Sequence, residues 1–257
     1  MKKKLFIFSN ESISVEDDKC YCDNLDLKST PEGLNKKFEV NLFGRRSSKK
    51  RSHEIKIKRV KVFNNIFSYL SEVKKAVKTE GSKFLIISIS PYTFFIALLI
   101  KILGRKPMVY LRSDGYGEYK AIFGFLGPII YHFMFTITSM ISHLISCRKY
   151  ILKNKAGDLV SPSQLDDDWR SNTIITNLEK IKLLYVGRIK IEKGIFSLLD
   201  IIKNKNEIAL TIVGAEKNLP QKINQNNVSV FEIENNRQKL IKFYDDHNIF
   251  ILPSFTE

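Results

Sequence analysis

The chain has 257 residues, 44% of them hydrophobic, and carries a formal net charge of +15 at pH 7. This length allows one large or two medium hydrophobic cores, and the hydrophobic content excludes disorder as the default class. Three cysteines (Cys20, Cys22 and Cys147) are an odd number without metal-ligand partners, and Cys20-x-Cys22 has neither zinc-knuckle nor thioredoxin-like spacing. We therefore expect reduced thiols and no metal site.

The first apolar run, residues 5–8, follows three lysines and is too short for a secretory signal peptide. We therefore expect a cytoplasmic protein.

Positive charge concentrates in residues 36–61, where eleven basic residues face only Glu39 and Glu54. Such a cluster favours a polyanionic partner, either nucleic acid or an anionic lipid surface, and a solvated loop is the ordinary alternative. The cluster lacks interleaved aromatic residues and any nucleic-acid reading motif, so we expect no nucleic-acid partner. The basic residues expected at a membrane or acceptor surface are Arg45, Arg46, Lys49, Lys50 and Arg51.

Nine short apolar runs alternate with helix-length segments, which predicts parallel sheets with crossover helices. Because the strands are apolar throughout, we expect both faces of each sheet to be buried. The predicted strands are residues 5–8, 38–43, 84–90, 108–111, 143–146, 182–186, 208–213, 228–233 and 249–252.

Two segments without Asp, Glu, Lys or Arg, residues 84–100 and 121–147, have the length of a membrane span. Pro91 divides the first into a β-branched run and a helix-like run, which favours a buried strand followed by a buried helix. Glycine, proline, histidine and hydroxyl residues interrupt the second, which favours a helix against the core or a bilayer surface.

The rhythm of strands and helices is interrupted by Pro162, three consecutive aspartates and a polar run, before a new strand starts near residue 182. We therefore predict an α/β protein with two Rossmann-like domains. Residues 1–161 form the N-terminal, acceptor-side domain, 162–179 a linker, and 180–257 a partial nucleotide-sugar-binding domain. The second domain has only four predicted strands, so its sheet is expected to be incomplete.

Residues 182–202 predict a strand, a tight turn and a helix, with Gly187 at the end of the strand and Gly194 at the start of the helix. Unpaired backbone N–H groups and the dipole at a helix N-terminus favour phosphate. Arg188 and Lys193 at the two ends of the loop can converge on one diphosphate, whereas an ordinary solvated loop is the alternative interpretation.

Four short motifs follow one another in order: VGR (186–188), EKG (192–194), IVG (212–214) and PSFTE (253–257). Together they resemble the C-terminal domain of family 4 glycosyltransferases of the two-Rossmann-domain GT-B type. Residues 88–115 and 160–167 resemble, more weakly, an active-site stretch and the crossover between domains in that family.

The resemblance implies that Arg188 and Lys193 hold the diphosphate of a nucleotide-sugar donor, beside Gly187 and Gly194. It implies that Glu257 is the first glutamate of a pair, contacts the donor sugar and belongs to the catalytic site; the second would follow the last residue. It also implies retention of anomeric configuration without a metal or other cofactor.

The chain departs from the family pattern after the strand at 108–111, where a histidine is usual. Arg112, Asp114 and Glu118 follow instead. Asp114 or Glu118 is a candidate catalytic residue that orients an acceptor hydroxyl, and the alternative for Asp114 is a turn cap.

We expect a glycosyltransferase that acts on a lipid-linked saccharide in surface polysaccharide synthesis, peripherally bound at the inner face of the membrane. The alternative is a catalytically inactive fragment that acts as a membrane-associated binding module.

Overall fold

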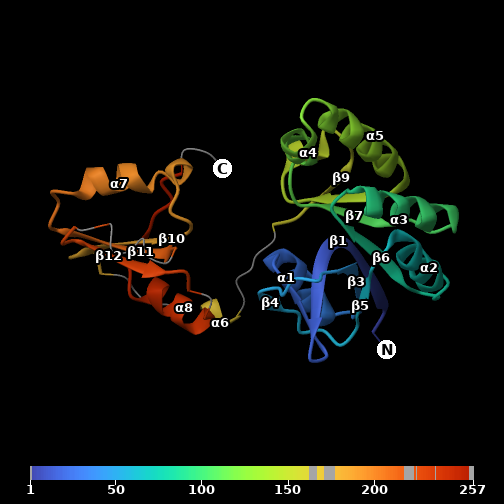
Figure 1. Ribbon diagram of the computed structural model, residues 1–257, viewed down its shortest axis with the longest axis horizontal. Coiled ribbons are helices and arrows are strands. Elements are labelled where there is room, and N and C mark those ends of the chain that lie inside the picture. The colour runs from blue at the N-terminus through green and yellow to red at the C-terminus, as the bar shows by residue number, and fades with distance from the viewer. Residues whose placement is uncertain are drawn as a thin grey trace. The chain divides into compact units, whose positions relative to one another are not determined.

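The computed structural model describes residues 2–161, 167–170, 177–216, 223, 225–234 and 236–254. The chain divides into two compact units, Met1–Gln164 and Leu165–Glu257 (Figure 1). Each unit has its own sheet, as expected for an α/β protein with two Rossmann-like domains.

The first unit is built on a nine-stranded sheet. Its parallel strands lie in the order β5-β3-β1-β6-β7-β8-β9, and the short β2 and β4 extend it as antiparallel neighbours at the end of β1. The strands are β1 (Lys4–Glu16), β2 (Lys19–Cys22), β3 (Glu39–Arg46), β4 (His53–Glu54), β5 (Val60–Phe63), β6 (Lys83–Ile87), β7 (Met108–Leu111), β8 (His143–Ser146) and β9 (Gly157–Leu159).

Five α-helices and one 3-10 helix surround this sheet among the described residues. They are α1 (Leu25–Asn35), α2 (Ile66–Val77), α3 (Pro91–Ile102), α4 (Gly115–Phe123), α5 (Leu126–Ile141) and η1 (Lys149–Leu152). α3 begins with a capping box: the Ser90 N–H donates to Thr93 Oγ1 (2.8 Å), the Thr93 N–H donates to Ser90 Oγ (3.3 Å), and Pro91 occupies the first turn.

The two faces of the first sheet are covered unequally. Alternate strand residues such as Phe8, Ile86 and Val109 pack against α2, α3, α4 and α5. The opposite face, which includes Leu85 and Tyr110, packs against α1 alone among the described helices. Leu85, Ile87 and Tyr110 are buried on this face, as expected, whereas Met108 and Ile145 are half-buried.

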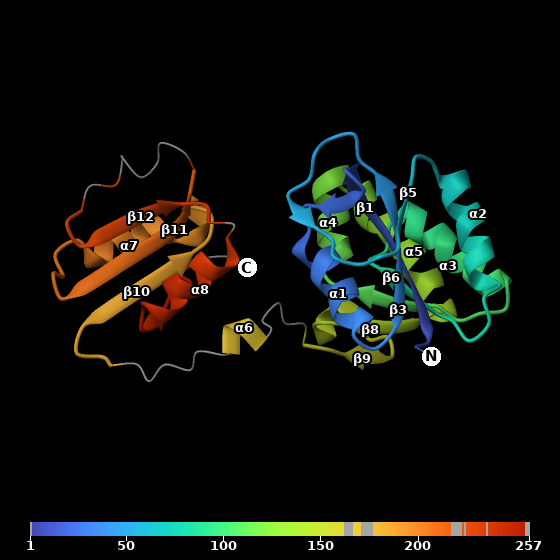
Figure 2. The same ribbon diagram turned by 90° about the horizontal axis from the view of Figure 1, so that it is seen from below.

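The described residues of the second unit form a four-stranded parallel sheet in the order β12-β11-β10-β13. Helices α7 and α8 lie on opposite faces of it (Figures 1 and 2). The elements are α6 (Asp167–Arg170), β10 (Ile181–Val186), η2 (Ile191–Lys193), α7 (Ile195–Ile202), β11 (Ile208–Ala215), β12 (Val228–Glu232), α8 (Arg237–Asp245) and β13 (Ile249–Phe250).

The segment expected to be a linker contains α6. Its Trp169 ring packs edge-on against Tyr244 of α8, with ring centroids 5.2 Å apart, and Asp168 pairs with Arg237 at 3.6 Å. The three aspartates interrupt the apolar pattern, but the indole beside them provides an apolar contact that holds α6 on the second unit.

All nine predicted strands are present. The uncharged segment 121–147 forms the end of α4, all of α5 and β8. Among the described residues, no helix is both long and apolar enough to span a bilayer.

Candidate functional site

The candidate donor site lies at the carboxyl ends of β10 and β11. These strands run parallel, with Tyr185 opposite Ile212 and Val186 opposite Val213, so their ends meet at one edge of the sheet. The Gly187 N–H donates to the carbonyl of Val213 at 2.9 Å. A side chain on Gly214 would place its Cβ 2.3 Å from the Gly187 carbonyl oxygen, so the two glycines bring these backbones into contact.

Gly194 brings the second and fourth motifs into contact. It has a left-handed backbone (φ +66°), and an added Cβ would lie 1.9 Å from the carbonyl oxygen of Pro253, which follows β13. Only glycine fits this conformation and this close approach without strain. The motifs VGR, EKG, IVG and the start of PSFTE therefore meet in space, although they are separated along the chain.

Helix α7 starts directly after Gly194, and no described side chain caps it. Its first turn is held by Ile195, which is fully buried, and by the Leu198 N–H, which donates to the Gly194 carbonyl at 3.1 Å. The backbone N–H groups of the residues before Leu198 are in the first turn of the helix, where N–H groups have no hydrogen-bond acceptor within the helix. This end of α7 therefore offers backbone donors and a partial positive charge to an anion.

The two predicted cations lie on the loop between β10 and α7. Arg188 is exposed, and its carbonyl accepts a 2.8 Å hydrogen bond from the Tyr185 hydroxyl, which fixes the backbone of the loop. Lys193 is half-buried at the end of η2, immediately before Gly194. In the described part of the chain, neither side chain forms an ion pair. The structure therefore places both predicted cations close in sequence to the start of α7, whereas the predicted Glu257 lies outside the described residues.

The predicted acceptor residues are in the first unit. Asp114 caps α4: its Oδ1 accepts from the Tyr116 N–H at 3.3 Å, and its Oδ2 lies 3.5 Å from Lys153 Nζ. This is the capping role that the sequence left open as the alternative. Glu118 is exposed in the first turn of the same helix.

The five predicted basic residues of the 36–61 cluster differ in their surroundings. Arg45 lies over the ring of Tyr92, 5.0 Å from its centroid. Lys50 pairs with Glu16 at 3.1 Å, and Arg51 pairs with Asp23. Arg46 and Lys49 are exposed. Acids outside the 36–61 segment therefore neutralise part of a charge that looked uncompensated in the sequence.

Sequence reasoning missed the role of Arg112, which holds the carboxyl end of β7 to α1. Its Nη1 donates to Asn24 Oδ1 at 2.9 Å and lies 3.5 Å from Asp26, and its Nη2 lies 3.3 Å from Glu11. Its Nε is buried without a hydrogen-bond partner among the described residues. The only signal in the sequence was an arginine directly after a buried strand.

Solved structures with a similar fold define the fold class of this chain. Sucrose-phosphate synthase from Thermosynechococcus elongatus matches 100% of this chain and 76% of its own, at 14% identity and a TM-score of 0.55. MurG from Acinetobacter baumannii matches 96% and 72%, at 11% identity and a TM-score of 0.54. The UDP-GlcNAc 2-epimerase of Methanocaldococcus jannaschii matches 96% and 77%, at 13% identity and a TM-score of 0.51. The chain therefore has the GT-B fold of two Rossmann-like domains, as the motifs predicted.

The family match is specific to the second unit. Residues 169–257 match the family of glycosyl transferases group 1, and this range contains the whole candidate donor site. The chain thus has the GT-B fold, and its residues 169–257 are similar to group 1 glycosyl transferases, as the resemblance of the four motifs predicted. No curated protein sequence matches the chain.

Proposed function

We propose that the chain transfers a sugar from a nucleotide-diphosphate donor whose diphosphate binds between Arg188, Lys193 and the N-terminus of α7. Arginine offers a planar fork and lysine a point charge, and both are matched to phosphate oxygens. Together with the helix N-terminus, these cations offset the charge that develops on the leaving diphosphate. The proposal therefore needs no divalent metal or other cofactor.

The observation that carries this proposal is the contact of Gly194 with Pro253 and of Gly214 with Gly187. These contacts pack the backbone around the uncapped start of α7. A preorganised set of donors does not have to reorganise when the donor's charge develops, which is the condition for electrostatic catalysis.

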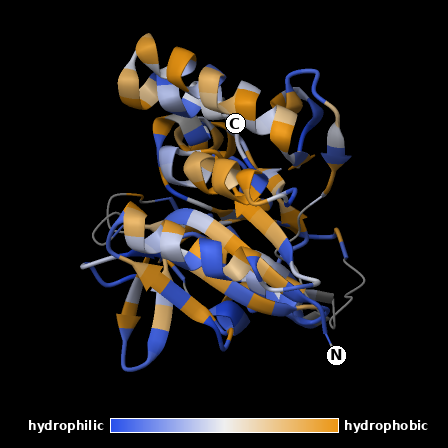
Figure 3. Cartoon of the chain, turned by 90° about the vertical axis from the view of Figure 1, so that its right-hand side faces the viewer, coloured by the Kyte–Doolittle hydropathy of each residue, from blue (hydrophilic) through white to orange (hydrophobic). Residues whose placement is uncertain are grey.

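For the acceptor, we propose a lipid-linked saccharide used in surface polysaccharide synthesis at the inner face of the cell membrane, with anomeric retention. The support for a membrane surface comes from α4 and α5, which carry many hydrophobic residues (Figure 3, helices at the top). Seven large apolar side chains on these helices and the turn between them are exposed. Exposed apolar patches of this kind mark interaction or membrane surfaces. The residues are Ile122, Phe123, Phe125, Leu126, Ile129, Ile130 and Phe133.

The basic 36–61 cluster lies elsewhere on the same unit. Its residues lie on and between β3, β4 and the start of β5, whereas α5 packs over β7 and β8. Strands β1 and β6 lie between these two parts of the sheet (Figure 1). We therefore base the membrane contact on α4 and α5 and assign the basic residues at most a long-range attraction.

Isothermal titration of the 257-residue chain with UDP, GDP and ADP tests the donor site. We expect one nucleotide to bind, and Arg188→Ala and Lys193→Ala each to weaken it by roughly 1.5–3 kcal/mol, the range for charge-assisted hydrogen bonds. Lys205→Ala, at the other end of α7, is the matched control and should bind like the original chain. Equal affinity in all four proteins would reject the assignment of the diphosphate to this loop.

A further inference from the structure

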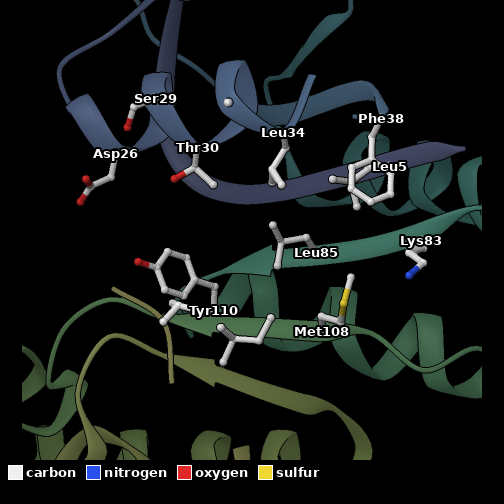
Figure 4. A pocket seen from close by; sticks show the side chains of 13 residues that line it. Leu5, Asp26, Ser29, Thr30, Leu34, Phe38, Lys83, Leu85, Met108 and Tyr110 are labelled. Atoms are coloured by element: carbon white, nitrogen blue, oxygen red, sulfur yellow. The ribbon is translucent and has the colours of Figure 1, made fainter. Parts of the chain in front are cut away.

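The first unit contains a cavity of about 720 Å³ on the sheet face that α1 only partly covers. This volume is within the range of pockets that hold small organic ligands, roughly 300–1,000 Å³. The cavity lies between α1 and strands β1, β6, β7 and β8 (Figure 4). All its lining residues belong to the first unit, whereas the donor motifs belong to the second.

The middle of the cavity is apolar. Its lining comes mainly from aliphatic and aromatic side chains on both walls: Leu5, Leu34, Phe38, Leu85, Met108, Ile145 and Val160. From β1 to β8 the lining crosses three strand spacings, or about 14 Å. Gly33 of α1 also lines it, and a Cβ added there would meet none of the described atoms within 4 Å.

The two ends of the cavity differ in charge. At the carboxyl ends of the strands, the lining includes Tyr110 of β7 and Asp26 of α1 (Figure 4), and burial raises the pKa of the Tyr110 phenol. At the amino ends stands Lys83, which is exposed and forms no ion pair in the part of the chain that the structure describes.

More lysines gather at this amino edge of the sheet. Lys83 pairs with Leu5 at the start of β1, so the lysines before β1 lie beside it. The Lys2 ammonium donates to the Asn35 carbonyl at 3.0 Å, which brings that segment to the end of α1. The edge also carries the exposed Lys36, Lys37 and Lys106. The apolar cavity therefore opens at one end onto a concentration of positive charge.

We propose that this cavity binds a single-chain anionic amphiphile, with the aliphatic chain between α1 and the sheet and the anionic head at Lys83. The charge at the amino edge selects the anionic head, and the lining selects an unbranched apolar chain. The cavity is on the face opposite α4 and α5, so the ligand enters as a single molecule rather than as part of a bilayer. This inference needs neither a nucleotide sugar nor glycosyl transfer.

Titration calorimetry with dodecanoate below its micelle concentration tests the proposal on the 257-residue chain. Gly33→Leu fills the cavity from α1 and should weaken binding at least about tenfold, because the leucine takes the place of the aliphatic chain. The matched control is Gly117→Leu, since Gly117 is also exposed and helical, and an added Cβ would meet no described atom within 4 Å. The control should bind within about twofold of the original chain.

The charge of the head is tested separately. Lys83→Glu should weaken dodecanoate binding by about fivefold and favour dodecyltrimethylammonium, which has the same chain and the opposite charge. Both leucine variants should melt no lower than the original chain, because leucine is a better helix former than glycine.

Three results would overturn the proposal. One is the absence of dodecanoate binding, and a second is equal binding by the Gly33→Leu and Gly117→Leu variants. The third is that the cavity binds lipid only as part of a bilayer. In that case Gly33→Leu would abolish binding to phosphatidylglycerol vesicles, and monomeric dodecanoate would not bind.

Discussion

Gly194 combines a left-handed backbone with a contact that leaves no room for a side chain. Gly194→Ala must move the Pro253 carbonyl, which lies 1.9 Å from the new Cβ position, and must also hold alanine at φ +66°. We expect the free energy of unfolding of the second unit to fall by at least about 1 kcal/mol. We also expect nucleotide affinity to fall, because the start of α7 would shift.

Urea unfolding of Gly194→Ala beside Gly117→Ala measures this effect. Gly117 has no neighbour within 4 Å of an added Cβ, so its alanine variant should be as stable as the original chain or more so. Unchanged stability of Gly194→Ala would show that the contact with Pro253 is not fixed.

Tyr69 of α2 lies in the hydrophobic core of the first unit and forms hydrogen bonds to the backbone of β1 and β3. Its fully buried hydroxyl lies 2.8 Å from the Phe43 carbonyl and accepts from the Ser9 N–H at 3.1 Å, and burial raises the pKa of its phenol. Because the unfolded chain releases this proton near pH 10, the tyrosine's contribution to stability is complete below about pH 10 and falls as the pH rises further.

Tyr69→Phe should therefore cost about 1–3 kcal/mol at pH 7, by leaving the Ser9 N–H and the Phe43 carbonyl without their partner. It should also flatten the loss of stability above pH 10. Urea unfolding at neutral and alkaline pH measures both effects. Equal alkaline losses in the two proteins would contradict the assignment of this titration to Tyr69.

At the scale of elements, α4 and α5 meet through glycine. A Cβ on Gly127 would lie 1.9 Å from the Tyr119 carbonyl oxygen, so Gly127→Ala must separate the two helices. We expect a loss of about 1–3 kcal/mol and faster amide exchange in α4 and α5. Protection unchanged from the original chain would show that the helices do not depend on this close approach.

The sequence predicted secondary structure best for strands that are apolar along most of their length. Runs such as MVYL (108–111) and HLIS (143–146) match β7 and β8. The prediction was too short for the first strand, which it ended at residue 8, before the polar run SNESISVEDD (9–18). There β1 continues through a bulge to Glu16, and Asp17 and Asp18, both with positive φ, turn the chain into β2. A two-residue hairpin turn without glycine and a polar strand lack the usual sequence signals.

The candidate donor site was predictable as a set of motifs but not as a structure. The strand, loop and helix with Arg188 and Lys193 follow from local patterns, whereas the contact of Gly194 with Pro253 depends on pairing between β10 and β13. The cavity beside α1 was not predicted, because apolar strands indicate burial on both faces and do not reveal where a covering helix ends.

At the scale of the whole molecule, the net charge of +15 alone does not identify which surface contacts a membrane. We expect Phe125→Glu with Ile129→Glu to abolish binding to anionic vesicles, because both side chains are exposed on the apolar surface of α4 and α5. Charge reversal of Arg45, Arg46, Lys49, Lys50 and Arg51 should weaken binding less, and only at low salt. Co-sedimentation measures both, and the opposite order would assign the membrane contact to the basic cluster.

The position of a bound nucleotide tests the central claim most directly. A crystal structure of the chain with the nucleotide diphosphate selected by titration should show phosphate oxygens within hydrogen-bond distance of Arg188, Lys193 and the first backbone N–H groups of α7. A diphosphate bound anywhere else, with these three groups in contact only with solvent, would contradict the proposed donor site.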